Sequence, residues 1–237
     1  MRTVGCLVFD GVRPFDYAVI GEVWAERSGL PGIPDFELRV CGPEGARVRL
    51  GGGLERVPGL ERVPDFGLDA LAACDLVVVP GVERPDEPRD PAVHAALRAA
   101  HGRGVTIASL CAGAFVLAEA GLLDGRTATT HWALADRLAE RFPAVDVRPE
   151  VLFTGEGRLW TSAGVAAGID LCLHLVRAAH GERAAASIAR AMVTAPFRSG
   201  GQAQFIPSPV PEPAPAGDDP LARVRTEVLA ALDTPWT

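Results

Sequence analysis

The sequence lacks several features that would assign it to a particular class of protein. An excess of positive charge is missing: 23 basic and 30 acidic residues among 237 give a net charge of −7, which argues against a broad nucleic-acid-binding surface. No apolar run reaches the roughly 20 residues of a membrane span, and the longest, 104–118, has a turn signal in its middle. The N-terminal apolar run is too short for a signal peptide. We therefore expect a cytoplasmic protein without a membrane partner.

Paired cysteines are missing as well. The five cysteines form an odd set without a C-x-x-C pair, which predicts neither a disulfide framework nor a zinc site. Reduced thiols are typical of a cytosolic protein, and we expect no metal and no cofactor. Four of the five lie in apolar stretches or at strand ends, as buried thiols do. Only Cys111 has a different setting.

What the sequence does contain is 48% hydrophobic residues, enough for a sizeable core, in short apolar runs that alternate with helical patterns. The runs typical of buried strands are 4–9, 36–41, 76–79 and 105–109. Helical apolar spacing covers 15–27, 88–101, 112–120, 132–140 and 164–180. This interleaving predicts a mostly parallel sheet covered on both faces, a three-layer α/β sandwich. Segments 47–63 and 151–162 contain glycines and are predicted as hairpins or irregular excursions inserted on the sheet.

The composition changes near the C-terminus. Segment 207–217 is rich in proline and cannot contribute to a core, so 207–219 is predicted as an extended linker after a first domain at 1–206. Pro220 then begins an amphipathic pattern that continues to Thr237. A single amphipathic helix has nothing of its own to pack against. We interpret 220–237 as the first helix of a second domain that this chain does not contain.

Cys111 follows the strand predicted at 105–109 and precedes a helix, with the small residues Ser109 and Gly113 two positions away on either side. This spacing is that of a nucleophile elbow, a sharp turn that exposes the central side chain. A helix N-terminus favours the thiolate and would lower the pKa of the thiol. The alternative is a cysteine buried in the core.

A second turn lies at the end of a neighbouring strand, where Pro80 and Gly81 follow 76–79. Ligands of open α/β folds bind at this edge of the sheet. The backbone N–H groups of Val82 and Ala112 would then form a nest for an anion or an oxyanion. Alternatively, the Pro-Gly pair only turns the chain.

Several segments together resemble a known family. They are 9–24, 78–81, 109–132, 161–171 and 198–205, and they are similar to the DJ-1/PfpI superfamily, in the branch that forms the N-terminal half of AraC-type (GlxA-like) transcription regulators. The similarity covers nearly all of 3–206, and 198–205 is its most discriminating motif. The resemblance implies a flavodoxin-like, class I glutamine amidotransferase-like fold and a homodimer. It also implies a helix-turn-helix domain after the linker, through which alone DNA would be bound.

The resemblance also implies a carboxylate near the cysteine. Asp16 matches the acidic position that faces the cysteine in isonitrile hydratases of this superfamily, and it would act as a general acid or base. Alternatively, its charge only complements the dipole of the first helix. An ionised Asp16 would oppose the thiolate that the helix end favours.

The histidines depart from the pattern of the hydrolytic members. Ala112 stands where the PfpI branch has a histidine directly after the cysteine, which excludes a dyad of adjacent residues. His131 is placed to approach the site from a loop after the next strand, or else it serves as a structural hydrogen-bonding residue. His174 lies on an apolar helix and is interpreted as a core histidine.

The leading hypothesis is a small-molecule-sensing and dimerising domain of a transcription regulator. Its pocket would centre on Cys111 and include Ala112, Gly81, Val82, Asp16 and His131. The rival is a cysteine enzyme that uses Cys111 and Asp16, such as an isonitrile hydratase-like hydro-lyase, or a glyoxalase-like or amidase-like enzyme. A third reading, compatible with the first, is a redox sensor at Cys111.

Overall fold

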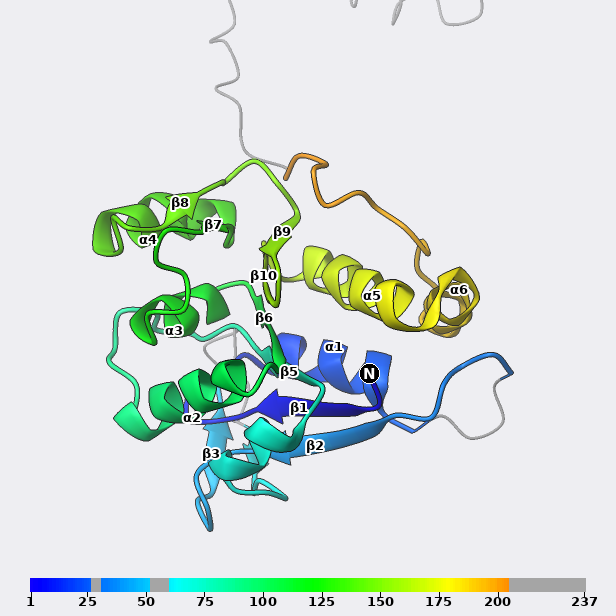
Figure 1. The fold of residues 1–237 in the computed structure, drawn as a ribbon, viewed down its shortest axis with the longest axis horizontal. Coiled ribbons are helices and arrows are strands. Elements are labelled where there is room, and N and C mark those ends of the chain that lie inside the picture. The colour runs from blue at the N-terminus through cyan, green and yellow to red at the C-terminus, as the bar shows by residue number, and fades with distance from the viewer. Residues whose placement is uncertain (27–30, 52–59, 205–237) are drawn as a thin grey trace, which may run out of the picture. The chain divides into compact units, whose positions relative to one another are not determined.

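A six-stranded sheet with the strand order β2-β1-β5-β6-β10-β9 forms the centre of the molecule (Figure 1). The structure is a computed structural model that describes residues 1–26, 31–51 and 60–204. The strands are β1 (Thr3–Leu7), β2 (Glu37–Cys41), β5 (Leu76–Val79), β6 (Thr106–Leu110), β9 (Phe153–Glu156) and β10 (Leu159–Ser162). Only β9 runs antiparallel to its neighbour. The predicted mostly parallel sheet is therefore confirmed.

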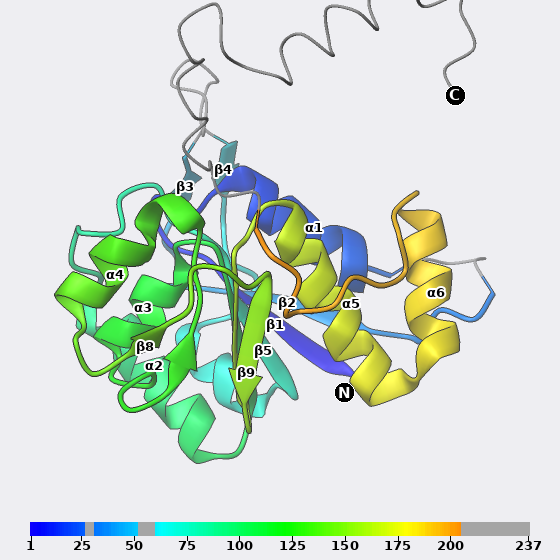
Figure 2. The ribbon, with the colours of Figure 1, turned by 90° about the horizontal axis from the view of Figure 1, so that it is seen from above.

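Helices cover both faces of this sheet, as Figure 2 shows from above. One face carries α1 (Pro14–Trp24), α5 (Ala166–His180) and α6 (Glu182–Ala191), and the other carries the 3-10 helix η1 (Leu68–Ala73), α2 (Pro91–Gly102) and α3 (Gly113–Glu119). Beyond α3 lie the 3-10 helix η2 (Trp132–Leu134) and α4 (Ala135–Arg141). Three layers result, as the sequence predicts. The sequence analysis missed α6, and its single helix at 132–140 is divided into η2 and α4.

Local chemistry explains where these helices begin. Asp90 caps α2 by accepting a hydrogen bond from the N–H of Ala92 at 2.8 Å, and Pro91 occupies the first helical position. Val93, Leu97 and Ala100 then repeat at helical spacing and are buried against the sheet. None of the helices in the described ranges is long and apolar enough to cross a membrane.

The two glycine-containing segments behave differently from each other. In the first, β3 (Val48–Leu50) pairs with β4 (Leu60–Arg62) in a separate antiparallel sheet, which agrees with a hairpin outside the main sheet. The second also forms an antiparallel hairpin, but the prediction that it is an insertion on the sheet is wrong. Its strands β9 and β10 belong to the central sheet, because β10 pairs with β6 in parallel register, with Leu159 opposite Ile107. The strands β7 (Thr127–Ala128) and β8 (Asp146–Val147) form a short parallel pair that is not part of the central sheet.

The first compact unit ends at Gln204. The predictions for the linker at 207–219 and for the helix at 220–237 fall on residues outside the described ranges. They remain predictions.

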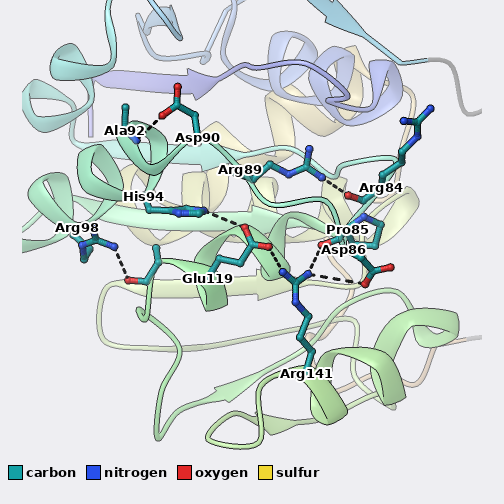
Figure 3. Close-up of polar contacts among 11 residues, drawn as sticks. Arg84, Pro85, Asp86, Arg89, Asp90, Ala92, His94, Arg98, Glu119 and Arg141 are labelled. Atoms are coloured by element: carbon teal, nitrogen blue, oxygen red, sulfur yellow. Dashed lines mark hydrogen bonds and ion pairs between the residues drawn. The ribbon is translucent and has the colours of Figure 1, made fainter.

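A single carboxylate joins the helices on one face. Glu119, at the end of α3, accepts a hydrogen bond from Arg141 of α4 at 2.6 Å and lies 3.1 Å from Nε2 of His94 on α2 (Figure 3). Arg141 also donates to the backbone oxygen of Pro85 at 2.7 Å. The side chain of Glu119 is only 8% exposed, so these contacts replace most of its contact with solvent.

We expect Glu119→Ala to lower the free energy of unfolding by about 2 kcal/mol, because Arg141 and His94 lose their buried acceptor. Glu87→Ala is the matched control, since Glu87 pairs with Arg84 on the open surface. It should leave the free energy of unfolding almost unchanged. Urea denaturation of both variants measures the difference, and equal effects would contradict the assigned role of Glu119.

Candidate functional site

Cys111 lies on a sharp turn between β6 and α3, as predicted. Its φ of 50° is in the left-handed region, which a residue other than glycine rarely adopts. Its N–H donates to the backbone oxygen of Ser162 at 3.0 Å, and its carbonyl accepts from the hydroxyl of Thr130 at 2.9 Å. The strained turn is therefore held from both sides by neighbouring segments.

Two glycines make room for this turn. A Cβ atom on Gly164 would lie 2.1 Å from the Cβ of Cys111, and one on Gly113 would lie 2.6 Å from the oxygen of Val79. Gly164 also has a φ of 76°. No larger residue fits at either position without a shift of the backbone.

Asp16 lies beside Cys111, as the resemblance implies. Its carboxylate is 1% exposed and accepts a hydrogen bond from the N–H of Gly81 at 2.9 Å. The backbone of Val165 supplies a further hydrogen bond. The first helix, the Pro-Gly turn and the start of α5 therefore meet at this carboxylate, which has a structural role whatever its chemistry.

Two backbone N–H groups around the predicted anion nest contact side chains of the site. The N–H of Gly81 is already taken by Asp16, and the N–H of Ala112 hydrogen-bonds to the sulfur of Cys111. Val82 is buried and pairs with Val12 in an isolated bridge. The N–H groups of Gly81 and Ala112 thus support the site's own side chains, and binding of a ligand by Val82 and Ala112 remains a prediction.

Burial of Cys111 outweighs the stabilisation of its thiolate by the helix N-terminus. Burial first, and then the charge of Asp16, raise the pKa of Cys111 to about 11, while the N–H of Ala112 and the charge of Arg13 have smaller lowering effects. Burial likewise raises the pKa of Asp16, against the N–H groups of Gly81 and Val165 and the charge of Arg13. Cys111 is only 2% exposed, which contradicts the expectation that the turn exposes its side chain and agrees with the alternative of a buried cysteine. A pKa near 11 favours the thiol over the thiolate at neutral pH.

His131 makes a local structural contact. Its Nδ1 accepts the N–H of Ala133 at 3.3 Å and so caps η2, and its ring lies 5.5 Å from that of Trp132. Burial and the charge of Arg13 lower the pKa of His131. Within the described ranges, no hydrogen bond joins it to Cys111 or Asp16. His174 packs against the rings of Phe153 and Trp160 but is only half-buried, so it lies at the edge of the core and not inside it.

Arg13 is the site residue that the sequence analysis missed. Its N–H donates to the backbone oxygen of Gly81 at 2.8 Å, and its charge lowers the pKa of Asp16, Cys111 and His131 alike. Its place directly before Pro14 and α1 was the only available signal. That position indicates the start of a helix but does not indicate a functional residue.

Two cavities lie away from Cys111. One of about 310 Å³ is lined by charged side chains that include Asp10, Arg49 and Arg89, and one of about 330 Å³ is lined by Cys6, Tyr17 and others. A pocket centred on Cys111 therefore remains a prediction. Nor does the described part of the chain bring three or more histidine, cysteine or acidic side chains together in a way that would hold a metal ion.

Comparison with known proteins shows which proteins this chain is similar to. The sequence profile of the DJ-1/PfpI family matches residues 2–178. The HTH-type transcriptional regulator CdhR of Pseudomonas aeruginosa is 38% identical over 148 residues, 62% of this chain and 44% of the regulator. The isonitrile hydratase of Pseudomonas putida is 30% identical over 231 residues, 95% of this chain and 93% of the enzyme. The chain thus spans less than half the length of CdhR.

A solved structure agrees with the fold. An AraC family transcriptional regulator from Pseudomonas putida superposes with a TM-score of 0.65 at 23% identity, covering 81% of this chain and 100% of that one. Drosophila melanogaster DJ-1beta superposes equally well, with a TM-score of 0.65 at 20% identity, over 82% of this chain and 98% of that one. These likenesses establish the flavodoxin-like architecture.

Alkylation of Cys111 by iodoacetamide should be slow at about pH 7 and should rise about tenfold per pH unit up to about pH 10, because only the thiolate reacts. Asp16→Asn should shift this profile to lower pH, because it removes a negative charge that raises the pKa of the thiol. Site-resolved mass spectrometry measures the rates. Fast labelling at neutral pH, or a profile that Asp16→Asn does not move, would contradict the neutral buried thiol.

Gly164→Ala should destabilise the fold by at least about 2 kcal/mol more than Gly125→Ala. Both glycines have a φ near 70°, but only Gly164 is crowded, since a Cβ on Gly125 meets no atom within 4 Å. The difference between the two variants in thermal or urea unfolding therefore isolates the contact with Cys111. A difference near zero would show that the backbone around Cys111 can shift to accommodate the added Cβ at little cost in stability.

Proposed function

The chain belongs to the DJ-1/PfpI family, and from this premise we propose that it is the small-molecule-sensing and dimerising domain of an AraC-type transcriptional regulator. The observation that carries the proposal is the neutral, buried thiol of Cys111, held beside Asp16 without a histidine base. A nucleophile needs activation by a base or a lowered pKa. This site instead offers a fixed set of polar groups, which suits recognition.

The chemistry of these groups favours a small polar ligand. Cys111 and Asp16 have raised pKa values, and Arg13 adds a positive charge. Three large apolar side chains that follow or precede site residues are exposed: Phe15 by 51%, Val165 by 42% and Trp132 by 38%. Exposed apolar side chains near a site are typical of surfaces that a ligand or a partner covers. They support a homodimer whose interface borders the site.

The relatives of this chain include several HTH-type transcriptional regulators, among them CdhR and GlxA. In our proposal DNA is bound only by a separate C-terminal domain, joined through the linker predicted at 207–219 and beginning with the helix predicted at 220–237. Ligand occupancy at Cys111 would then change the position of that domain, which requires different ligand affinities in two states.

One observation favours a second function, hydration of an isonitrile. The alignment with the isonitrile hydratase covers 95% of this chain, so it extends past Gln204 into the segment assigned to the linker and helix. Asp16, whose pKa is raised by burial, is suited to hold a proton for donation. In this alternative Cys111 would react in spite of its high pKa.

The two functions predict different responses to an alkyl isonitrile and to a panel of amino acids, organic acids and amines. A sensor binds one of the metabolites reversibly, which calorimetry detects, and Asp16→Asn weakens that binding by about tenfold. A hydratase releases an N-substituted formamide, detected by mass spectrometry. Turnover that Cys111→Ser abolishes without unfolding the protein would overturn the sensing proposal.

The proposed dimer has its own test. At micromolar concentration the chain should sediment as a dimer, and replacing exposed Phe15 with Glu should shift it towards the monomer because a charge would be buried at the interface. Val193→Glu is the matched control, since Val193 is 93% exposed and lies at the end of α6. A monomeric wild-type chain would contradict the proposal.

A further inference from the structure

We infer that Gln204 couples the Cys111 turn to the point where the chain leaves its first folded unit, through a buried hydrogen-bond path that includes Thr130. The inference rests on the proposed sensing function, for which it supplies a route out of the site. Gln204 is the last residue of that unit, and both Gln204 and Thr130 are buried.

The first link joins Thr130 to the site. The hydroxyl of Thr130 donates to the carbonyl oxygen of Cys111 at 2.9 Å, and Thr130 is 0% exposed. The carbonyl belongs to the peptide between Cys111 and Ala112, whose N–H faces the sulfur. Any ligand that rotates this peptide therefore changes the acceptor of Thr130.

The second link joins Thr130 to Gln204. The side-chain amide of Gln204 donates to the carbonyl oxygens of Thr130 at 3.1 Å and Val151 at 3.0 Å, and its oxygen accepts the N–H of Trp132 at 3.0 Å. An amide with two donor contacts and an acceptor contact has one orientation only. The end of the folded unit is thereby fixed to the loop that holds Cys111.

A parallel branch reaches the other side of the same turn. The N–H of Thr129 donates to the hydroxyl of Thr161 at 2.8 Å, and the hydroxyl of Thr129 lies 3.4 Å from the amide nitrogen of Gln204. Thr161 on β10 precedes Ser162, whose backbone oxygen accepts the N–H of Cys111. Both polar backbone groups of Cys111 are therefore connected to the surroundings of Gln204. Buried networks of this kind respond as a unit.

The rest of the terminal segment is anchored independently. Figure 1 shows it running from α6 back to the end of the sheet near β9. Arg198 forms a two-contact ion pair with buried Asp170 of α5, the oxygen of Gly200 accepts the N–H of Leu152 at 2.8 Å, and Ala203 bridges to Val151. Movement at Gln204 can thus be confined to the end of the segment while its beginning stays in place.

The reactivity of Cys111 in the 237-residue chain tests the coupling without a ligand. Because coupling is reciprocal, loosening Gln204 must loosen the Cys111 turn. We expect Gln204→Ala to raise the alkylation rate of Cys111 at about pH 9 by about tenfold. This factor corresponds to the loss of one buried hydrogen-bond partner. Gln202→Ala, in the same segment but exposed, should leave that rate unchanged. Labelling of Cys172, fully buried in α5, reports global unfolding in the same spectra.

Variants of Thr130 test whether Thr130 and Gln204 affect Cys111 labelling through one shared hydrogen-bond path or independently of each other. Thr130→Val removes the hydroxyl and should raise Cys111 labelling like Gln204→Ala, whereas Thr130→Ser keeps it and should behave as wild type. In the double variant Thr130→Val with Gln204→Ala, the two increases should fall well short of multiplying. Unchanged labelling in Gln204→Ala, a parallel rise at Cys172, or multiplying effects would each overturn the inference. Ligand binding by calorimetry is independent of this outcome, so a failure of the sensing proposal is recognised separately.

Discussion

The left-handed backbone of Cys111 is the constraint around which this site is built. A left-handed residue with a side chain is strained, and the strain persists only where surrounding structure enforces it. Here Gly164 and Gly113 admit the backbone, while Ser162 and Thr130 hold its N–H and C=O groups. The turn brings β5, β6, β10 and the start of α5 into contact. The same contacts bury the thiol.

Burial has opposite consequences for catalysis and for recognition. A helix N-terminus alone would favour a thiolate, but loss of solvent and the charge of Asp16 outweigh it at Cys111. Asp16 in turn is held by the N–H of Gly81 and lies near Arg13. Both side chains are thereby held in fixed positions by neighbouring backbone groups. Fixed polar groups suit the proposed binding of a small molecule, whereas nucleophilic attack would first need a base.

Local sequence patterns could predict much of this fold and the turn itself. β5 and β6 lie where apolar runs place them, and Ser109 and Gly113 mark the elbow. The incorporation of β9 and β10 into the main sheet escaped prediction, because pairing with β6 depends on register between distant segments. Burial of the Cys111 thiol could not be predicted either, because it also depends on contacts between distant segments. It depends on Asp16 and Gly164, which approach Cys111 only in the folded chain.

The segment at 198–204 illustrates how a motif can carry several physical roles at once. Arg198 provides an ion pair, Gly200 allows contact with Phe153, and Gln204 connects to Thr130. A Cβ on Gly200 would lie 2.7 Å from the oxygen of Phe153, so the close approach requires glycine. In the proposed sensing function, the same contacts would also connect the Cys111 turn to the end of the folded unit at Gln204.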